Sequence, residues 1–97
     1  MAVYIVARIT IADRERYSQY EAGFMDIFAA HEGKLLAVDD NPEVLEGEWR
    51  GTRTVIAEFP DQEAALAWYR SDDYQSLAQH RFAASEGEIA LVTGLGS

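Results

Sequence analysis

One stretch of this chain joins a strand directly to a helix, and it constrains the fold more than any other. Residues Arg53–Phe59 are mostly β-branched or apolar, and Pro60 ends the strand because proline has no N–H and a fixed φ. Asp61 is a good helix N-cap, and Gln62–Leu66 are good helix formers. The other elements can be placed relative to this joint.

The rest of the chain alternates between strand and helix patterns. The spacing predicts a strand over 3–11, a helix from an Asp13 N-cap to about His31, a strand over 34–39, a strand from about Trp49 to Phe59, a helix after Asp61, a helix from about Tyr74 to Ser85, and a strand over 88–93. Gly33 is expected to end the first helix as its C′ residue, and Gly87 to end the last helix. Residues 43–50 show no clear pattern.

This order, β-α-β-β-α-β with the second helix broken in two, is typical of the ferredoxin-like α+β fold. The 97 residues form one domain, and the antiparallel sheet carries its helices on one face only. Yet the other face is also apolar, since Ile56 alternates with Val55 and Val92 with Leu91. A second copy of the chain would cover that face, so we expect a homodimer.

Composition excludes several classes of function. The net charge of −9 and the scattered Lys and Arg residues argue against binding to nucleic acid or anionic membranes. The chain has no cysteine, two histidines without a ligand-like spacing, and no phosphate-binding or dinucleotide-binding glycine motif, so no metal and no cofactor are expected. No apolar run reaches membrane-helix length and the N-terminus lacks a basic region, which favours a cytoplasmic protein.

An ordered set of short motifs resembles a known family. The motifs are Tyr17-Ser18-Gln19-Tyr20, Gly47-Glu48-Trp49, Arg53–Pro60, Ala64-Ala65, Tyr69-Arg70-Ser71, Tyr74 and Arg81. Together they resemble the domain-of-unknown-function family 1330 of the dimeric α/β-barrel superfamily. The resemblance covers nearly the whole chain and implies a ferredoxin-like fold paired face to face into a barrel. One departure is Glu32-Gly33, where the family often has two glycines.

The resemblance implies no single function. Sister families in the superfamily include cofactor-free monooxygenases, haem-degrading enzymes, dye-type peroxidases and small-molecule isomerases, so the fold leaves the chemistry open.

Arg81 is the most informative candidate residue, because it lies in the middle of an apolar helical stripe that includes Tyr74 and Leu77. A buried guanidinium needs an anionic partner. One possibility is a structural partner, which would be Glu58, Asp39 or a carboxylate of a second subunit. The other is a substrate carboxylate, which a guanidinium binds through two parallel hydrogen bonds.

The other candidates fit two hypotheses of different classes. In the first, a small-molecule binding domain holds a carboxylate-bearing or aromatic ligand between sheet and helices, with Tyr74, Arg53 and Trp49 beside Arg81. In the second, a cofactor-independent monooxygenase or isomerase uses His31 or Glu58 as a base, and the arginine stabilises an enolate-like anion. His31 is also explained by the negative end of its helix, and Glu58 by an ion pair.

Overall fold

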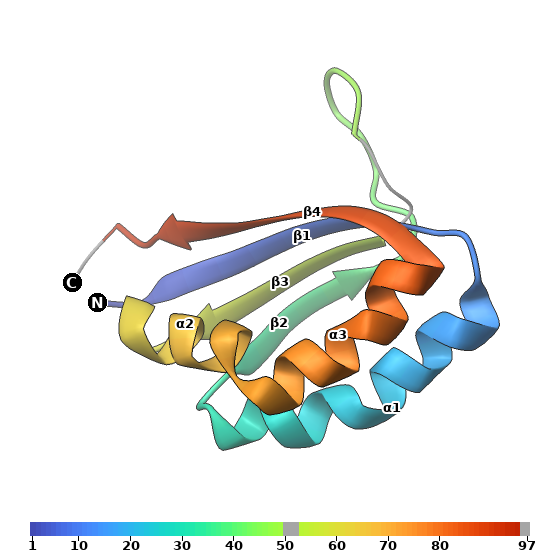
Figure 1. Ribbon diagram of the computed structural model, residues 1–97. Helices are drawn as coiled ribbons and strands as arrows, with labels where there is room; N and C mark the ends of the chain where they lie inside the picture. Colours follow the sequence, from blue (N-terminus) through green and yellow to red (C-terminus); the bar gives the residue numbers. More distant parts are fainter. Residues whose placement is uncertain (50–52, 96–97) are drawn as a thin grey trace.

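A computed structural model describes residues 1–49 and 53–95 (Figure 1). Within these residues the elements are β1 (Val3–Ile11), α1 (Arg14–Ala30), β2 (Lys34–Asp39), β3 (Arg53–Phe59), α2 (Gln62–Arg70), α3 (Asp72–Ala84) and β4 (Ser85–Thr93). None of the described helices is long and apolar enough to cross a membrane.

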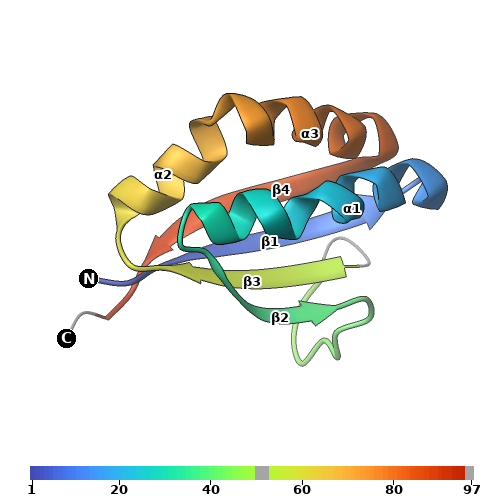
Figure 2. The ribbon, with the colours of Figure 1, turned by 90° about the horizontal axis from the view of Figure 1, so that it is seen from below.

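The four described strands form one antiparallel sheet in the order β2-β3-β1-β4. All three described helices lie on one face of this sheet, and none of them lies on its other face (Figure 2). The predicted ferredoxin-like α+β fold is therefore confirmed.

The core lies between the sheet and the helices. Val3, Ile5, Ala7 and Ile9 of β1 are buried and point toward the helices, as their alternation predicts. A cluster of aromatic rings packs over them. In this cluster the ring centroid of Phe28 lies 5.1 Å from that of Phe59.

Three helix N-caps follow from the local sequence. The Asp13 carboxylate accepts a hydrogen bond from the Arg16 amide, and the Asp61 carboxylate accepts one from the Ala64 amide, as predicted. The Ser71 hydroxyl caps α3 by accepting from the Tyr74 amide. α3 therefore begins at Asp72 and not at the predicted Tyr74, because a serine cap places the first helical residue immediately after it.

The last strand also begins earlier than predicted. β4 starts at Ser85, so Gly87 lies within the strand, opposite Ile9, and does not end the helix. A Cβ at Gly87 would lie 3.1 Å from the carbonyl oxygen of Arg8, so glycine permits a close approach of the two strands. At the start of β3, the predicted extension toward Trp49 falls partly on residues 50–52, outside the described residues.

The end of α1 corrects the role expected for Gly33. The residue with a left-handed backbone is Glu32, at φ 66°, and it occupies the C′ position. The Glu32 amide donates to the Ala29 carbonyl and the Gly33 amide to the Phe28 carbonyl, both at 3.1 Å, which is the Schellman pattern. Gly33 is therefore the C″ residue, and a Cβ there would lie 2.6 Å from the Phe28 ring.

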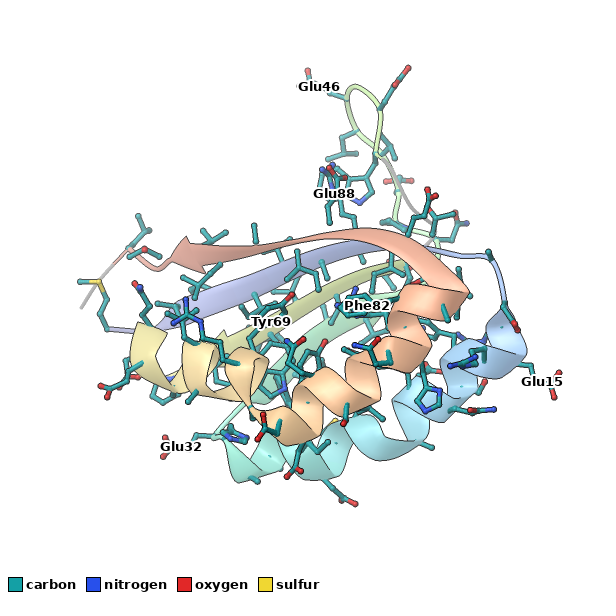
Figure 3. All side chains as sticks on the ribbon, viewed as in Figure 1. Glu15, Glu32, Glu46, Tyr69, Phe82 and Glu88 are labelled. Carbon is teal, nitrogen blue, oxygen red and sulfur yellow. The ribbon has the colours of Figure 1, made fainter. Side chains whose placement is uncertain are left out.

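Residues 40–49 follow β2 without forming a helix or strand and extend from the side of the sheet that carries no helices (Figures 1 and 2). Glu46 lies at the tip of this segment, and Glu88 of β4 lies near its base (Figure 3). The Trp49 indole N–H donates to the Thr54 hydroxyl at 2.8 Å, and the Arg8 guanidinium carbon lies 5.0 Å from the indole centroid. Trp49 thus packs on the outer face of the sheet.

Candidate functional site

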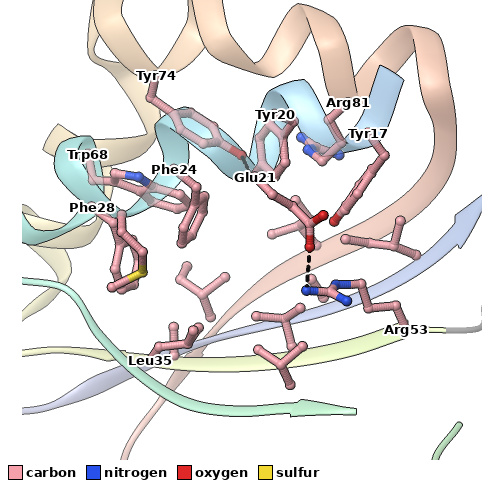
Figure 4. Close-up of a pocket in the computed structure, with 18 residues that line it drawn as sticks. Tyr17, Tyr20, Glu21, Phe24, Phe28, Leu35, Arg53, Trp68, Tyr74 and Arg81 are labelled. Atoms are coloured by element: carbon pink, nitrogen blue, oxygen red, sulfur yellow. Dashed lines mark hydrogen bonds and ion pairs between the residues drawn. The ribbon is translucent and has the colours of Figure 1, made fainter. Parts of the chain in front are cut away.

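A cavity of about 230 Å³ lies between the helices and the inner face of the sheet (Figure 4). Its walls are mostly apolar: the strands contribute aliphatic side chains such as Ile5 and Val55, and the helices contribute aromatic ones such as Phe24 and Trp68. Among the lining residues, only Glu21, Arg53 and Arg81 carry a charge at neutral pH.

The cavity reaches the surface between α1 and the edge strand β2. Met25 of α1 is 49% exposed, and Leu35 and Val38 of β2 are 36% and 40% exposed, although all three line the cavity. Exposed apolar side chains that face one another across an opening suit a mouth through which an apolar molecule passes.

Arg81 lies deep in the cavity and is only 5% exposed. No described carboxylate pairs with it, and its Nε is enclosed without an acceptor among the described residues. Its guanidinium carbon lies 4.7 Å from the Phe82 ring centroid and 5.9 Å from that of Tyr20. Burial lowers the pKa of Arg81, but the neighbouring Tyr74 and Tyr20 hydroxyls raise it and the net shift is upward, so the group stays charged.

Neither of the intrachain carboxylates considered for Arg81 is its partner. Glu58 lies opposite Tyr4 and Lys34 on the outer face of the sheet, and Asp39 lies opposite Thr54 on the same face. Arg81 is held on α3, on the inner side. Of the alternatives considered for Arg81, these two carboxylates therefore do not pair with it, because strand alternation directs both away from the helices.

Two tyrosine hydroxyls meet beside Arg81. The hydroxyl oxygens of Tyr20 and Tyr74 are 2.8 Å apart, and both rings are buried. Burial, together with the adjacent Tyr74 hydroxyl, strongly raises the pKa of Tyr20. Burial also raises the pKa of Tyr17, and this shift is only partly offset by the nearby Arg53 cation. These phenols therefore present neutral hydroxyl groups to the cavity.

Arg53, the second arginine that lines the cavity, belongs to a chain of ion pairs. The Arg53 guanidinium donates through one terminal nitrogen to Glu21 at 2.9 Å and through the other to Asp40 at 2.7 Å. Glu21 also pairs with Arg14 at 3.1 Å. Burial lowers the pKa of Arg53, but the Asp40 hydrogen bond and the carboxylates around it raise it overall. Arg53 is thus a compensated cation, in contrast to Arg81.

The structure brings together some of the candidate residues and separates others. Arg81, Tyr74 and Arg53 all line the cavity, whereas Trp49 lies on the opposite face of the sheet. His31 is at the end of α1, where its Nδ1 lies 3.1 Å from the Ile27 carbonyl oxygen, and it does not line the cavity. Glu58 does not line it either. Neither proposed base is therefore positioned to act on a molecule held there.

Glu21 is the charged lining residue that the sequence analysis did not single out. It follows Tyr20 and comes four residues after Tyr17, so helical spacing places it on the margin of the inward aromatic stripe. That spacing is a usable signal. Tyr17 and Tyr20, on the same helix, are buried. The described residues contain no cluster of three side chains able to hold a metal ion.

The sequence profile of the DUF1330 family, described as a domain of unknown function, matches residues 2–95. The chain belongs to this family. Comparison with curated proteins gives no significant match to the DUF1330 chain.

Solved structures with the same fold have low sequence identity to this DUF1330 protein. A protein of unknown function from Rhodopseudomonas palustris has a TM-score of 0.83 and 18% identity, over 99% of this chain and 84% of the other. SnoaB, a cofactor-independent oxygenase from Streptomyces nogalater, has a TM-score of 0.68 and 20% identity, over 99% and 95%. A DABB family protein from Mesorhizobium loti has a TM-score of 0.68 and 12% identity, over 98% of both chains. At such identities these likenesses establish the fold alone.

Proposed function

We propose that this DUF1330 domain binds a small aromatic acid in the cavity between sheet and helices. The observation that carries the proposal is Arg81, a buried cation that no described carboxylate neutralises. An unpaired buried charge is costly to the folded state, and a ligand carboxylate would supply the missing partner. A planar guanidinium suits this role because it can donate two parallel hydrogen bonds.

The cavity walls support an aromatic body for the ligand. The cavity volume of about 230 Å³ exceeds the roughly 150 Å³ of an engineered cavity that holds benzene. One ring with a short acidic arm would fit such a space. Phe24, Trp68 and the tyrosines of α1 offer ring faces and edges to it.

Some residues that line the cavity also carry buried hydrogen-bond donors. Three buried N–H donors have no acceptor among the described residues: Nε of Arg53, Nε1 of Trp68 and Nε of Arg81. All three belong to residues that line the cavity. All three nitrogens are enclosed by protein atoms, so a ligand in the cavity would contact other atoms of these residues.

Calorimetric titration with benzoate, phenylacetate and cinnamate tests the proposal, with cinnamamide as a neutral analogue. We expect an acid to bind and the amide to bind at least tenfold more weakly. Because a charged hydrogen bond contributes about 1.5–3 kcal/mol, Arg81→Met should weaken acid binding by about 10-fold to 100-fold.

The matched control is Arg70→Met, which changes an exposed arginine of α2 that does not line the cavity. It should leave the affinity unchanged. Equal affinity of wild type and Arg81→Met for every acid, or equal binding of acid and amide, would refute the proposal.

Cofactor-independent oxygenation is a second candidate. Arg81 and the paired hydroxyls of Tyr20 and Tyr74 would suit an enolate or phenolate anion, and SnoaB, which shares the fold, is described as an oxygenase of this type. Since His31 and Glu58 lie outside the cavity, any base would have to be Glu21, which two arginines already engage. Measurement of oxygen consumption with a bound acid or phenol tests this candidate. A rate of oxygen consumption equal to the rate without protein would refute it.

We also propose that two copies of the chain pair through the outer face of the sheet. Val92 and Trp49 are 45% and 43% exposed there, and none of the described helices covers the face (Figure 2). Native mass spectrometry should give a dimer. Val92→Glu should weaken it, whereas Ala67→Glu, at an exposed position of α2, should not. A wild-type monomer at micromolar concentration would overturn this proposal.

A further inference from the structure

Glu21 neutralises one of the two arginines that line the cavity. Its carboxylate points from α1 toward Arg53, and the dashed contact in Figure 4 joins the two groups. The Arg53 side chain is only 13% exposed and that of Glu21 is 31% exposed, so water screens this pair only in part. The pair therefore removes Arg53 as an unpaired positive charge facing the cavity.

The remaining positive charge in the cavity is that of Arg81. Of the three charged residues that line the cavity, Arg53 and Glu21 neutralise each other, while no described carboxylate faces Arg81. A ligand with one negative charge balances this arrangement. A second ligand carboxylate would face apolar walls or Glu21, where it would be desolvated or repelled.

From this arrangement we infer that Glu21 is a specificity-determining residue that restricts the cavity to monoanionic aromatic acids. The inference rests on the proposed function, because it presupposes that Arg81 receives the first carboxylate. Glu21 occupies at Arg53 the position that a second ligand carboxylate would need. Loss of the Glu21 charge therefore opens a second anion position without altering the first.

Asp40 provides a matched control, because it binds the same guanidinium from outside the cavity. Its carboxylate accepts from the second terminal nitrogen of Arg53 at 2.7 Å, its side chain is 69% exposed, and it does not line the cavity. Asp40→Asn and Glu21→Gln each remove one of the two carboxylate charges that pair with Arg53. Only the Glu21 change frees a nitrogen that faces α1 and the cavity.

The experiment compares the dissociation constants of benzoate and of its ortho, meta and para dicarboxylates for wild type, Glu21→Gln and Asp40→Asn. Wild type should bind benzoate at least tenfold more tightly than each dicarboxylate. In Glu21→Gln at least one dicarboxylate should gain tenfold or more, while benzoate changes less than threefold. Asp40→Asn should keep the wild-type preference. Glu21→Met serves the same purpose if the glutamine variant does not fold.

The outcomes separate this inference from the proposed function. If benzoate binds in an Arg81-dependent way but Glu21→Gln keeps the wild-type ratio for all three isomers, this inference is wrong and the proposed function stands. An equal gain in Asp40→Asn would also overturn it, because general loss of negative charge would then explain the effect. If none of benzoate, phenylacetate and cinnamate binds to wild type, the proposed function itself fails.

Discussion

Replacing Arg81 with methionine should stabilise the ligand-free protein although it weakens acid binding. The side chain is 5% exposed, and its Nε has no acceptor among the described residues. Removal of a buried donor that lacks a partner relieves a penalty of about 1–3 kcal/mol. Methionine has a similar length, so it can fill the space without leaving a large void.

The opposing terms are smaller. The substitution loses contacts of the cation with the rings of Phe82 and Tyr20, at 4.7 and 5.9 Å, worth about 0.5–1 kcal/mol each. The methionine sulfur regains about 0.3–1.5 kcal/mol from the same rings. The free energy of unfolding should therefore rise by about 1–2 kcal/mol, which corresponds to about 4–10 °C in the melting temperature of a domain of this size.

Urea denaturation at fixed protein concentration, with and without an acid that binds wild type, measures both effects. Arg70→Met controls for the loss of one positive charge and should change stability by less than about 0.5 kcal/mol. Destabilisation of Arg81→Met by about 3–5 kcal/mol would refute the reasoning, because that is the cost of removing one partner of a buried ion pair. Arg81 would then have a stabilising partner other than the described carboxylates.

Three further predictions concern stability. Glu32→Gly should raise the free energy of unfolding by about 0.5–1 kcal/mol in urea denaturation, because glycine adopts the φ of 66° without steric cost. Gly33→Ala should lower the free energy of unfolding, because its Cβ would lie 2.6 Å from the Phe28 ring. The opposite pair of signs would contradict the assigned cap. Asp61→Ala should cost about 1 kcal/mol through loss of the α2 cap, and an unchanged urea midpoint would exclude that role. Burial raises the pKa of Tyr20, so the free energy of unfolding should not depend on this group below about pH 10. Above that pH it should fall by up to about 1.4 kcal/mol per pH unit, because the unfolded chain releases a proton that the folded chain retains. Tyr20→Phe should reduce that slope, and an identical slope would show that Tyr20 ionises equally in both states.

Local patterns predicted the architecture well. Alternation in Val3–Ile11 and the strand-to-helix joint at Pro60 and Asp61 identified which faces are buried and where α2 begins. Such features depend on neighbours within a few residues, so the chain carries them locally. The ends of α1 and α3 were less well predicted, because Glu32 and Ser71 act through hydrogen bonds that several sequences satisfy equally well.

For the candidate site, too, the sequence predicted features local to one element and not those that depend on contacts between elements. Helical spacing placed Arg81 on an inward stripe, and the structure buries it. The spacing could not reveal that Trp49 packs on the outer face of the sheet with Thr54. Nor could it reveal that Glu21 and Asp40, which lie far apart in sequence, meet at one guanidinium.

By itself, then, the sequence determined the order of elements, the inward faces of α1, α3 and β1, and the presence of a buried cation in an apolar surrounding. Only the tertiary structure decided which charges are compensated: Arg53 is paired with Glu21 and Asp40, whereas Arg81 has no carboxylate partner among the described residues. The physical reason is that periodicity specifies the direction of each side chain relative to its own element. Ion pairing depends on distances between elements, and these are set by strand register and by how far α1 lies from the sheet.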